Sequence, residues 1–147
     1  FITKNKKKKI QRNVFKLLNT EKKFGLYKIS TYKNFASQIQ NSKKKFKKKF
    51  GKIFRKNGKI IFFGAPAKAT TMLNYYGVSN QAQCIIEDNI LKINKFLPGV
   101  NIPIYSKDKI KSKSNLVVVL AWNFFEEIKK NNKKIFKRFI NIKELEK

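Results

Sequence analysis

The segment FFGAPAKATTMLNYYGV, residues 62–78, decides the fold of this 147-residue chain. It runs from an apolar stretch into a glycine turn and then into a predicted helix. The apolar stretch itself, KIIFFG at 59–64, is short and nearly continuous. A run of this kind predicts a strand that is buried on both faces of a parallel sheet.

Two further apolar runs, CIIED at 84–88 and LVVVLAW at 116–122, have the same character. Helices are predicted between the runs and after them, at 68–77 and 123–132. This β-α-β-α-β order, with right-handed crossovers, predicts a small Rossmann-like α/β domain of three layers with a mostly parallel sheet.

Weaker signals complete this domain. The segment 96–106 holds a proline-glycine turn and a short edge-like strand, and residues 136–142 are typical of a final strand. Asn123 and Glu126 have the spacing of a capping box at the start of the last helix.

A helical segment precedes the sheet. Residues 14–26 predict a short helix that ends at Gly25. Thr31 is the predicted N-cap of a long amphipathic helix that closes near Gly58. Its apolar residues share one stripe, which predicts a core-facing side: Tyr32, Phe35, Ala36, Ile39, Phe46, Phe50, Ile53 and Phe54. We therefore predict a domain at 31–147, with residues 1–30 holding a linker and the short helix.

The charge of the chain is extreme. There are 36 Lys and Arg against 8 Asp and Glu, a formal net charge of +28, but only three residues are Arg. The excess of Lys, Ile, Asn and Phe is typical of an AT-rich coding sequence, and most lysines of the long helix lie off its apolar stripe. We interpret them as a solvated face, and a basic nucleic-acid-binding protein stays as the alternative.

Histidine is absent from the sequence, and Cys84 is its single cysteine. A disulfide framework is excluded, and the commonest general base and metal ligand are missing. No segment has the roughly 20 apolar residues of a membrane span, so a cytoplasmic location is the expectation.

The turn after the first strand is the candidate site. In open α/β sheets, ligands collect at the carboxyl ends of strands, where the first turn presents backbone N–H groups and a helix dipole. Gly64 allows a sharp turn, Ala65, Pro66 and Ala67 keep it small, and Lys68 adds a positive charge. Pro66 departs from the GxGxxG pattern of dinucleotide sites, so a plain tight turn and a stand-alone nucleotide-binding module both stay open.

Glu87 and Asp88 end the next strand, about 20 residues further on, where an acidic side chain can accept hydrogen bonds from ribose hydroxyls. They extend the predicted site to the neighbouring strand.

Four segments together resemble the C-terminal domain of the S-adenosylmethionine-dependent sugar C-methyltransferases. They are GKIIFFGAPAKATTMLNYYGV, IIEDN, FLPGVNIPI and VVVLAWNFFEEI, which occur in the same order in that family. The resemblance covers residues 51–128 and extends back more weakly. Ala69 stands where the family has glycine, and Ile90 where it has proline after Asp88-Asn89.

This resemblance implies a division of labour. Family members bind zinc in an N-terminal segment, bind S-adenosylmethionine and carry a histidine base in a central domain, and close the Rossmann-like domain over a nucleotide-linked keto-sugar. The first residues, FITKNK, resemble the tail of the central domain. The chain is thus expected to be the sugar-nucleotide half of such an enzyme: its partners are the keto-sugar and the missing domain, and by itself it binds neither cofactor nor metal and transfers no methyl group.

Residues from three strand ends and one helix are expected to converge on one edge of the sheet and bind the sugar nucleotide, without any catalytic residue. The predicted binding residues are Gly64, Ala65, Pro66, Ala67, Lys68, Asn74, Asp88, Asn89, Trp122 and Asn123.

Overall fold

The computed structural model describes residues 4, 9–110 and 114–146. Its residues form two compact units, 1–41 and 42–147. The segment FITKNK was expected to resemble the tail of the preceding domain. Apart from Lys4, its residues lie outside the described part of the chain. The predicted domain boundary between residues 30 and 31 stays a prediction.

Helix α1 (Arg12–Phe24) ends where the sequence predicts. Gly25 follows it with φ 80°, and its N–H donates to the carbonyl of Lys22. Glycine adopts this left-handed conformation without the steric cost of a Cβ, which is why it ends the helix.

Helix α2 (Ile29–Asn57) begins two residues before the predicted N-cap. Thr31 is therefore inside the helix, and its hydroxyl donates to the carbonyl of Gly25 at 2.8 Å. The prediction for Thr31 was wrong because this hydroxyl bonds back to the preceding turn. The helix ends before Gly58, as predicted, with φ 71° at that glycine.

The predicted apolar stripe of α2 is buried in one part of the helix and exposed in another. Phe46 and Phe50, in the unit 42–147, are fully buried. Tyr32 and Phe35, in the unit 1–41, are exposed. One continuous buried stripe was thus a wrong expectation, because the described part of the smaller unit offers only the short α1 besides this helix.

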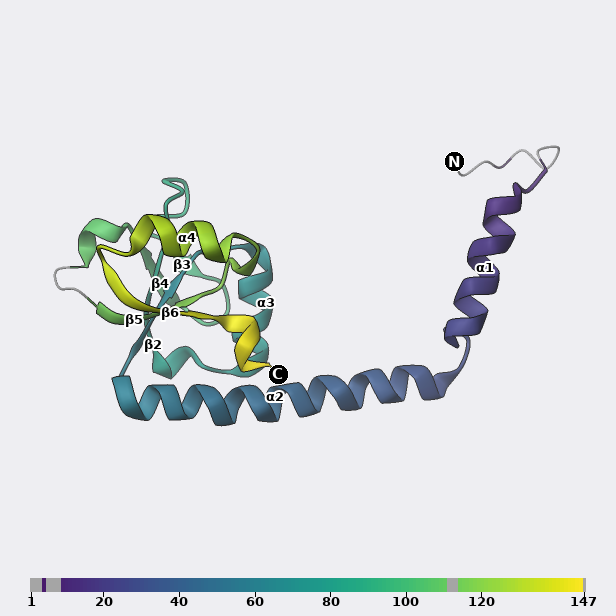
Figure 1. The fold of residues 1–147 in the computed structure, drawn as a ribbon, viewed down its shortest axis with the longest axis horizontal. Coiled ribbons are helices and arrows are strands. Elements are labelled where there is room, and N and C mark those ends of the chain that lie inside the picture. Colours follow the sequence, from purple (N-terminus) through teal and green to yellow (C-terminus); the bar gives the residue numbers. More distant parts are fainter. Residues whose placement is uncertain (1–3, 5–8, 111–113, 147) are drawn as a thin grey trace. The chain divides into compact units, whose positions relative to one another are not determined.

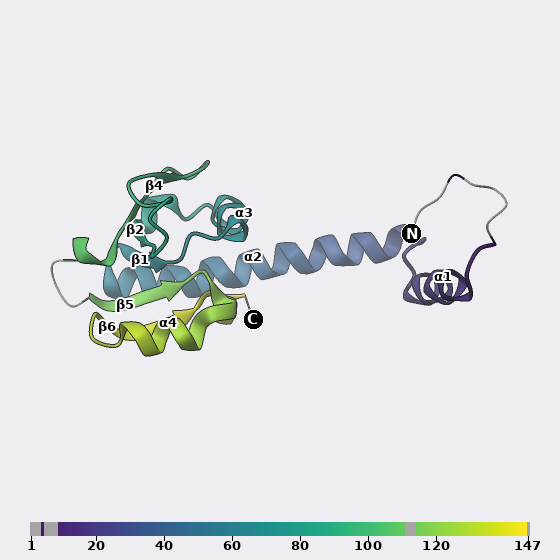
Figure 2. The same ribbon diagram turned by 90° about the horizontal axis from the view of Figure 1, so that it is seen from above.

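The sheet has six strands in the order β3-β4-β2-β1-β5-β6 (Figures 1 and 2). All neighbours are parallel except β3 and β4, which are antiparallel. The strands are β1 (Ile60–Phe63), β2 (Ala82–Ile86), β3 (Phe96–Leu97), β4 (Ile102–Tyr105), β5 (Ser114–Val119) and β6 (Phe136–Asn141). The predicted mostly parallel sheet, including its edge strand and final strand, is confirmed.

Successive residues of the central strands enter two different cores, which explains their continuous apolar runs. Phe62 and Val118 belong to the core that also holds Phe46 of α2 and Leu73 of α3 (Ala67–Tyr76). Neighbouring strand residues face the other side: Ile61, Phe63, Val117 and Val119 pack there with Ile128 of α4 (Phe125–Asn132). Helices on both faces of the sheet give the predicted three layers.

Three short 3₁₀ turns lie between these elements, η1 (Ser79–Gln81), η2 (Lys107–Lys109) and η3 (Trp122–Phe124), and a fourth, η4 (Ile142–Leu145), follows β6. In the part of the chain that the structure describes, no helix has the length and apolar character needed to cross a membrane.

Candidate functional site

The strand order places a topological switch point between β1 and β5. From β1 the chain adds β2 and then β4 on one side, and it returns to lay β5 and then β6 on the other side. Ligands of open α/β sheets bind at such a point, beyond the carboxyl ends of the strands. The structure therefore brings the turn after β1 and the turn after β5 together, as the sequence predicted for Gly64 and Trp122.

Gly64 is required in the first turn for two reasons. Its φ is 86°, and a Cβ at this position would lie 2.8 Å from the Cβ of Ala121. Its N–H donates to the carbonyl of Ile86 at 2.8 Å. The turn after β1 thus packs directly against the turn after β5 and is also tied to β2.

Glu87 holds this turn from the neighbouring strand. One carboxylate oxygen accepts the N–H of Ala65 at 2.8 Å, and the other accepts those of Asp88 and Asn89 at 3.0 and 3.1 Å. Both oxygens are engaged with backbone, so Glu87 positions the turn, and its role as a ribose acceptor stays a prediction. It also takes up the Ala65 N–H that an anion would otherwise use.

Lys92 completes this arrangement. Its Nζ donates to the carbonyl of Ala65 at 3.0 Å and lies 3.7 Å from the Glu87 carboxylate. The sequence analysis did not find this residue, since nothing in its local pattern shows that the loop folds back over Ala65.

The start of α3 keeps two donors available to a ligand. Pro66 is the N-cap and lacks an N–H, and the N–H of Ala69 donates to the Pro66 carbonyl at 2.9 Å. Ala67 and Lys68 occupy the first two helical positions, where an N–H has no acceptor within the helix. These are the groups of the predicted turn that an anion can reach, aided by the helix dipole.

Two lysine side chains lie close to the ring of Trp122. The Lys68 Nζ lies 3.6 Å from the centre of its ring, and the Lys143 Nζ lies 5.0 Å from it. Lys143 comes from η4, after β6, and sequence reasoning missed it. The Asn141 carboxamide oxygen accepts the Lys143 N–H at 3.1 Å, which fixes the start of η4 beside Trp122.

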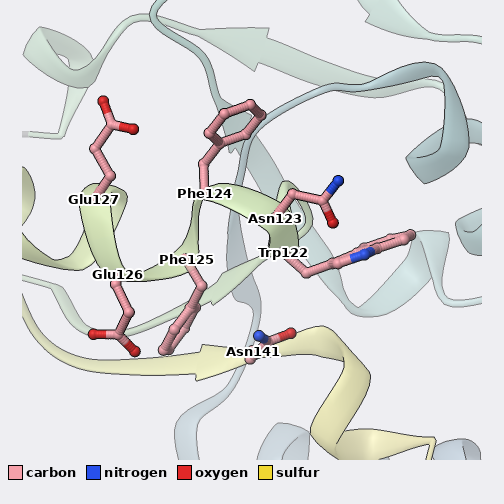
Figure 3. A pocket seen from close by; sticks show the side chains of 7 residues that line it. All are labelled: Trp122, Asn123, Phe124, Phe125, Glu126, Glu127 and Asn141. Carbon is pink, nitrogen blue, oxygen red and sulfur yellow. The ribbon is translucent and has the colours of Figure 1, made fainter.

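A cleft of about 300 Å³ opens next to Trp122 (Figure 3). Residues 122–127 and Asn141 line it, and we name it the η3 cleft. It combines aromatic rings, two carboxylates and two carboxamides. Its volume lies at the lower end of the roughly 300–1,000 Å³ that is typical of small-molecule sites.

Asn123 lines the η3 cleft but does not cap α4. It lies within η3, α4 begins at Phe125, and no side chain caps that helix. The predicted capping box of Asn123 and Glu126 was wrong because the chain makes a 3₁₀ turn before the helix.

Asp88 and Asn89 lie at the carboxyl edge, as predicted, in the loop that follows β2. The Asp88 carboxylate is 3.5 Å from the Lys107 Nζ, in an exposed ion pair. The Asn89 side-chain oxygen accepts the Leu91 N–H at 2.9 Å. Both side chains have contacts within the loop, and a role in binding stays a prediction.

Asn74 lies elsewhere. Its amide nitrogen donates to the carbonyls of Thr70 and Pro98 at 2.8 and 3.0 Å. Residues 98–101 form the turn between β3 and β4, at the amino end of β4. The structure thus places Asn74 at the opposite edge from Gly64, because α3 runs back from the carboxyl edge.

Two buried groups have raised pKa values. Burial raises the pKa of the Cys84 thiol to about 11. Burial, together with a 2.8 Å hydrogen bond from its hydroxyl to Glu146, raises the pKa of Tyr76 to about 12. Neither group lies in the η3 cleft, so we assign both to the core.

The comparisons with known proteins give the class of this chain. A family model described as the C-methyltransferase C-terminal domain matches residues 1–141, so the chain belongs to that family. It is similar to the C-methyltransferase NovU of Streptomyces niveus, with 27% identity over 132 residues. That match covers 86% of this chain but 31% of NovU, so the chain spans about a third of its relative.

Proposed function

We propose that this chain is the sugar-nucleotide-facing domain of an S-adenosylmethionine-dependent C-methyltransferase that acts on a nucleotide-linked keto-deoxysugar. Membership of the C-methyltransferase C-terminal domain family is the observation that carries the proposal. The open carboxyl edge supports it, because this edge offers N–H donors, lysines and a cleft where an extended anionic ligand fits.

The role of this chain is to bind and orient the ligand. The N–H groups of Ala67 and Lys68 hold a phosphate oxygen, and the ammonium groups of Lys68 and Lys143 balance its charge beside Trp122. Such charge-assisted hydrogen bonds are stronger than neutral ones. Glu87 and Lys92 do not touch the ligand but keep the turn in the required shape.

The base and the cofactor come from elsewhere in this proposal. The 147 residues contain no histidine, and Lys68 binds the phosphate in this proposal. S-adenosylmethionine supplies the methyl group when it is bound by the domain that faces this edge.

Zinc does not fit the residues present. Cys84 is the single cysteine of the sequence, and it is buried. Among the described residues, no three Cys, His, Asp or Glu side chains lie close enough to share a metal ion. We therefore derive no step from zinc in this chain.

Exposed apolar side chains near the edge support a covering domain. Ile90 and Leu91, in the loop after β2, are 81% and 72% exposed. Exposed apolar groups that are contiguous on a surface mark interaction sites.

Nuclear magnetic resonance shift mapping with thymidine diphosphate tests the proposal. We expect the amides of Ala67 and Lys68 to shift first, and Lys68→Ala to weaken binding about 5-fold, the effect of about 1 kcal/mol. Lys59→Ala is the matched control. It removes the same charge, but at the amino end of β1, away from the predicted turn. Equal weakening by both variants would indicate non-specific attraction and overturn the proposal.

A methyl-transfer assay gives a second test. The chain alone, with labelled S-adenosylmethionine and a thymidine-diphospho keto-sugar, should form no methylated product. Turnover would show that the base and cofactor site are present here. Steep salt-dependent binding to arbitrary duplex DNA, in place of diphosphate binding, would favour the nucleic-acid alternative.

A further inference from the structure

The smaller unit, 1–41, holds most of the exposed apolar side chains. In the described part of the chain, twelve of the seventeen large apolar side chains that are exposed lie between residues 10 and 39. No residue of α1 is buried. Exposed apolar groups that gather on one surface mark an interaction site, so this unit needs a partner of its own.

Helix α1 has one apolar side and one basic side. At 3.6 residues per turn, most of its apolar residues share an arc of about 120°: Val14, Leu17, Leu18 and Phe24. The alternating steps of three and four along 14, 17, 21 and 24 are typical of a helix that packs along another helix. The basic residues Arg12, Lys16 and Lys23 lie on the opposite side.

The turn between α1 and α2 extends this apolar side (Figure 1). Glu21 lies in the middle of the arc, and its carboxylate accepts the Tyr27 hydroxyl at 3.1 Å. The Tyr32 hydroxyl donates to the Leu26 carbonyl at 2.7 Å. These bonds keep the two helices together without a core, and a surface that is already ordered loses less entropy when it binds.

We name this surface the unit 1 face. It consists of residues from α1, the turn and the start of α2: Leu17, Leu18, Phe24, Tyr27, Tyr32 and Phe35. Its four aromatic side chains are between 52% and 76% exposed. At about 200 Å² for a whole aromatic side chain they expose on the order of 500 Å². With the two leucines the face approaches the roughly 800 Å² that each partner buries in a stable complex.

The charges of the face favour another protein surface over a lipid surface. Glu21 lies at the centre of the face, where an anionic bilayer would repel its carboxylate and an apolar one would strip it of water. The α1 lysines lie on the side away from the face, so they do not flank it. When two such faces meet, the basic sides stay on the outside of the pair.

We infer that the unit 1 face binds the same face of a second copy, so that this chain forms a two-fold dimer through α1 and the start of α2. A two-fold contact of this kind uses one patch on both copies and closes on itself. The inference goes beyond the proposed function and is independent of it, because the face contains no residue of the carboxyl edge.

Like charge opposes the pairing, since each copy carries a net charge of +28. Salt screens this repulsion over a Debye length of about 8 Å at physiological ionic strength, while apolar contacts persist. The dimer therefore becomes more stable as salt is added. Binding to nucleic acid shows the reverse dependence, because it releases counterions.

Sedimentation of the full chain over a range of concentrations and salt tests the inference. We expect a shift from the 17.3 kDa monomer to twice that mass as either one rises. In ¹⁵N spectra, dilution should shift the amides of 14–35 and leave those of β1 and β5 in place. Vesicles of phosphatidylglycerol serve as the competing probe and should not replace the second copy.

Two leucine variants locate the contact. Leu17 and Leu91 are both largely exposed, so replacing either with glutamine leaves the core intact. Leu17→Gln should weaken the dimer about 10-fold or more, because a two-fold contact contains each residue twice. Leu91→Gln, in the loop after β2, should not weaken it. Lys16→Gln, on the basic side of α1, should not weaken it either.

Four results would overturn the inference. They are a monomer at every concentration and salt, a dimer that dissociates as salt is added, equal weakening by Leu17→Gln and Leu91→Gln, and a monomer whose 14–35 amides respond to the vesicles. The last result would identify a lipid surface as the partner. None of them bears on diphosphate binding at Ala67 and Lys68, so the proposed function is tested separately.

Discussion

The Glu87 carboxylate accepts the backbone N–H of Ala65 at 2.8 Å, across 22 positions of sequence. This contact joins the end of β2 to the turn after β1. It shows that an acidic residue predicted to face a ligand also shapes the turn that would bind one.

Glu87→Gln should lower the free energy of unfolding by about 1–3 kcal/mol, the usual cost of leaving a buried N–H without a partner. Glutamine offers one oxygen where the carboxylate offers two, so Ala65 or the Asp88-Asn89 pair loses its acceptor. Urea unfolding monitored by circular dichroism measures the change.

Asp88→Asn is the control for this prediction. It removes a charge one residue away, in the exposed ion pair with Lys107. A surface pair of this kind contributes about 0–1 kcal/mol. If the two variants lose equal stability, Glu87 does not hold the turn.

Gly64→Ala should destabilise the fold by more than Gly58→Ala. Both glycines have positive φ, at 86° and 71°, so both substitutions carry the cost of about 1 kcal/mol for a left-handed residue. A Cβ at Gly64 also meets Ala121, whereas nothing lies within 4 Å of a Cβ at Gly58. The difference in unfolding free energy isolates the contact.

A double variant checks the same contact. Ala121→Gly removes the Cβ that a Gly64→Ala side chain would meet. We expect a favourable coupling energy between the two changes, of about 0.5–3 kcal/mol as found for residues in contact. If the changes in unfolding free energy simply add, the two turns are not in contact.

The raised pKa of Tyr76 predicts that the folded state loses stability at high pH. Its pKa is raised from 10.0 to about 12 in the folded chain, so the unfolded chain ionises first as the pH rises. The stabilisation is therefore complete below pH 10, falls between pH 10 and about 12, and levels off above that. Tyr76→Phe should abolish this part of the decline and also lose the hydrogen bond to Glu146.

Unfolding curves at several alkaline pH values measure this effect. Tyr105→Phe, at an exposed position, is the comparison. A decline of the same steepness in Tyr76→Phe and in the unchanged chain would disprove the assignment to Tyr76.

Cys84 should react slowly with thiol reagents in the native state. Burial raises its pKa from 9.0 to about 11. At neutral pH the fraction of reactive thiolate is therefore about 100-fold smaller than in the unfolded chain. Labelling with an aromatic disulfide in buffer and in urea measures the ratio. Fast labelling of the folded chain would show that the β2 core opens readily.

Much of the fold could be predicted because its signals are local. The continuous apolar runs at β1, β2 and β5 predict strands covered on both faces, and each of those strands is present and parallel to its neighbours. Gly25 and Gly58 end helices with positive φ, a conformation that glycine adopts most easily. Thr31 failed as a cap because its hydroxyl bonds back to the carbonyl of Gly25, and Asn123 failed because the chain makes a 3₁₀ turn before α4.

The candidate site was predictable only in part. Its location at the turn after β1 follows from the chain order, because strand ends and helix starts are known once strands are assigned. The partners of its side chains do not follow. Lys143 reaches Trp122, and Lys92 reaches Ala65, through contacts between segments that are distant in sequence.

The sequence alone determined the elements, their order and the glycine turn at the edge of the sheet, because backbone sterics and hydrophobic periodicity act over a few residues. The tertiary structure decided which groups of that edge are left for a ligand. In it Glu87 accepts a hydrogen bond from Ala65, and Asn74 lies at the opposite edge of the sheet. Lys68 and Lys143 both lie near the Trp122 ring. These outcomes depend on which strands become neighbours, and that is settled by packing of the whole sheet.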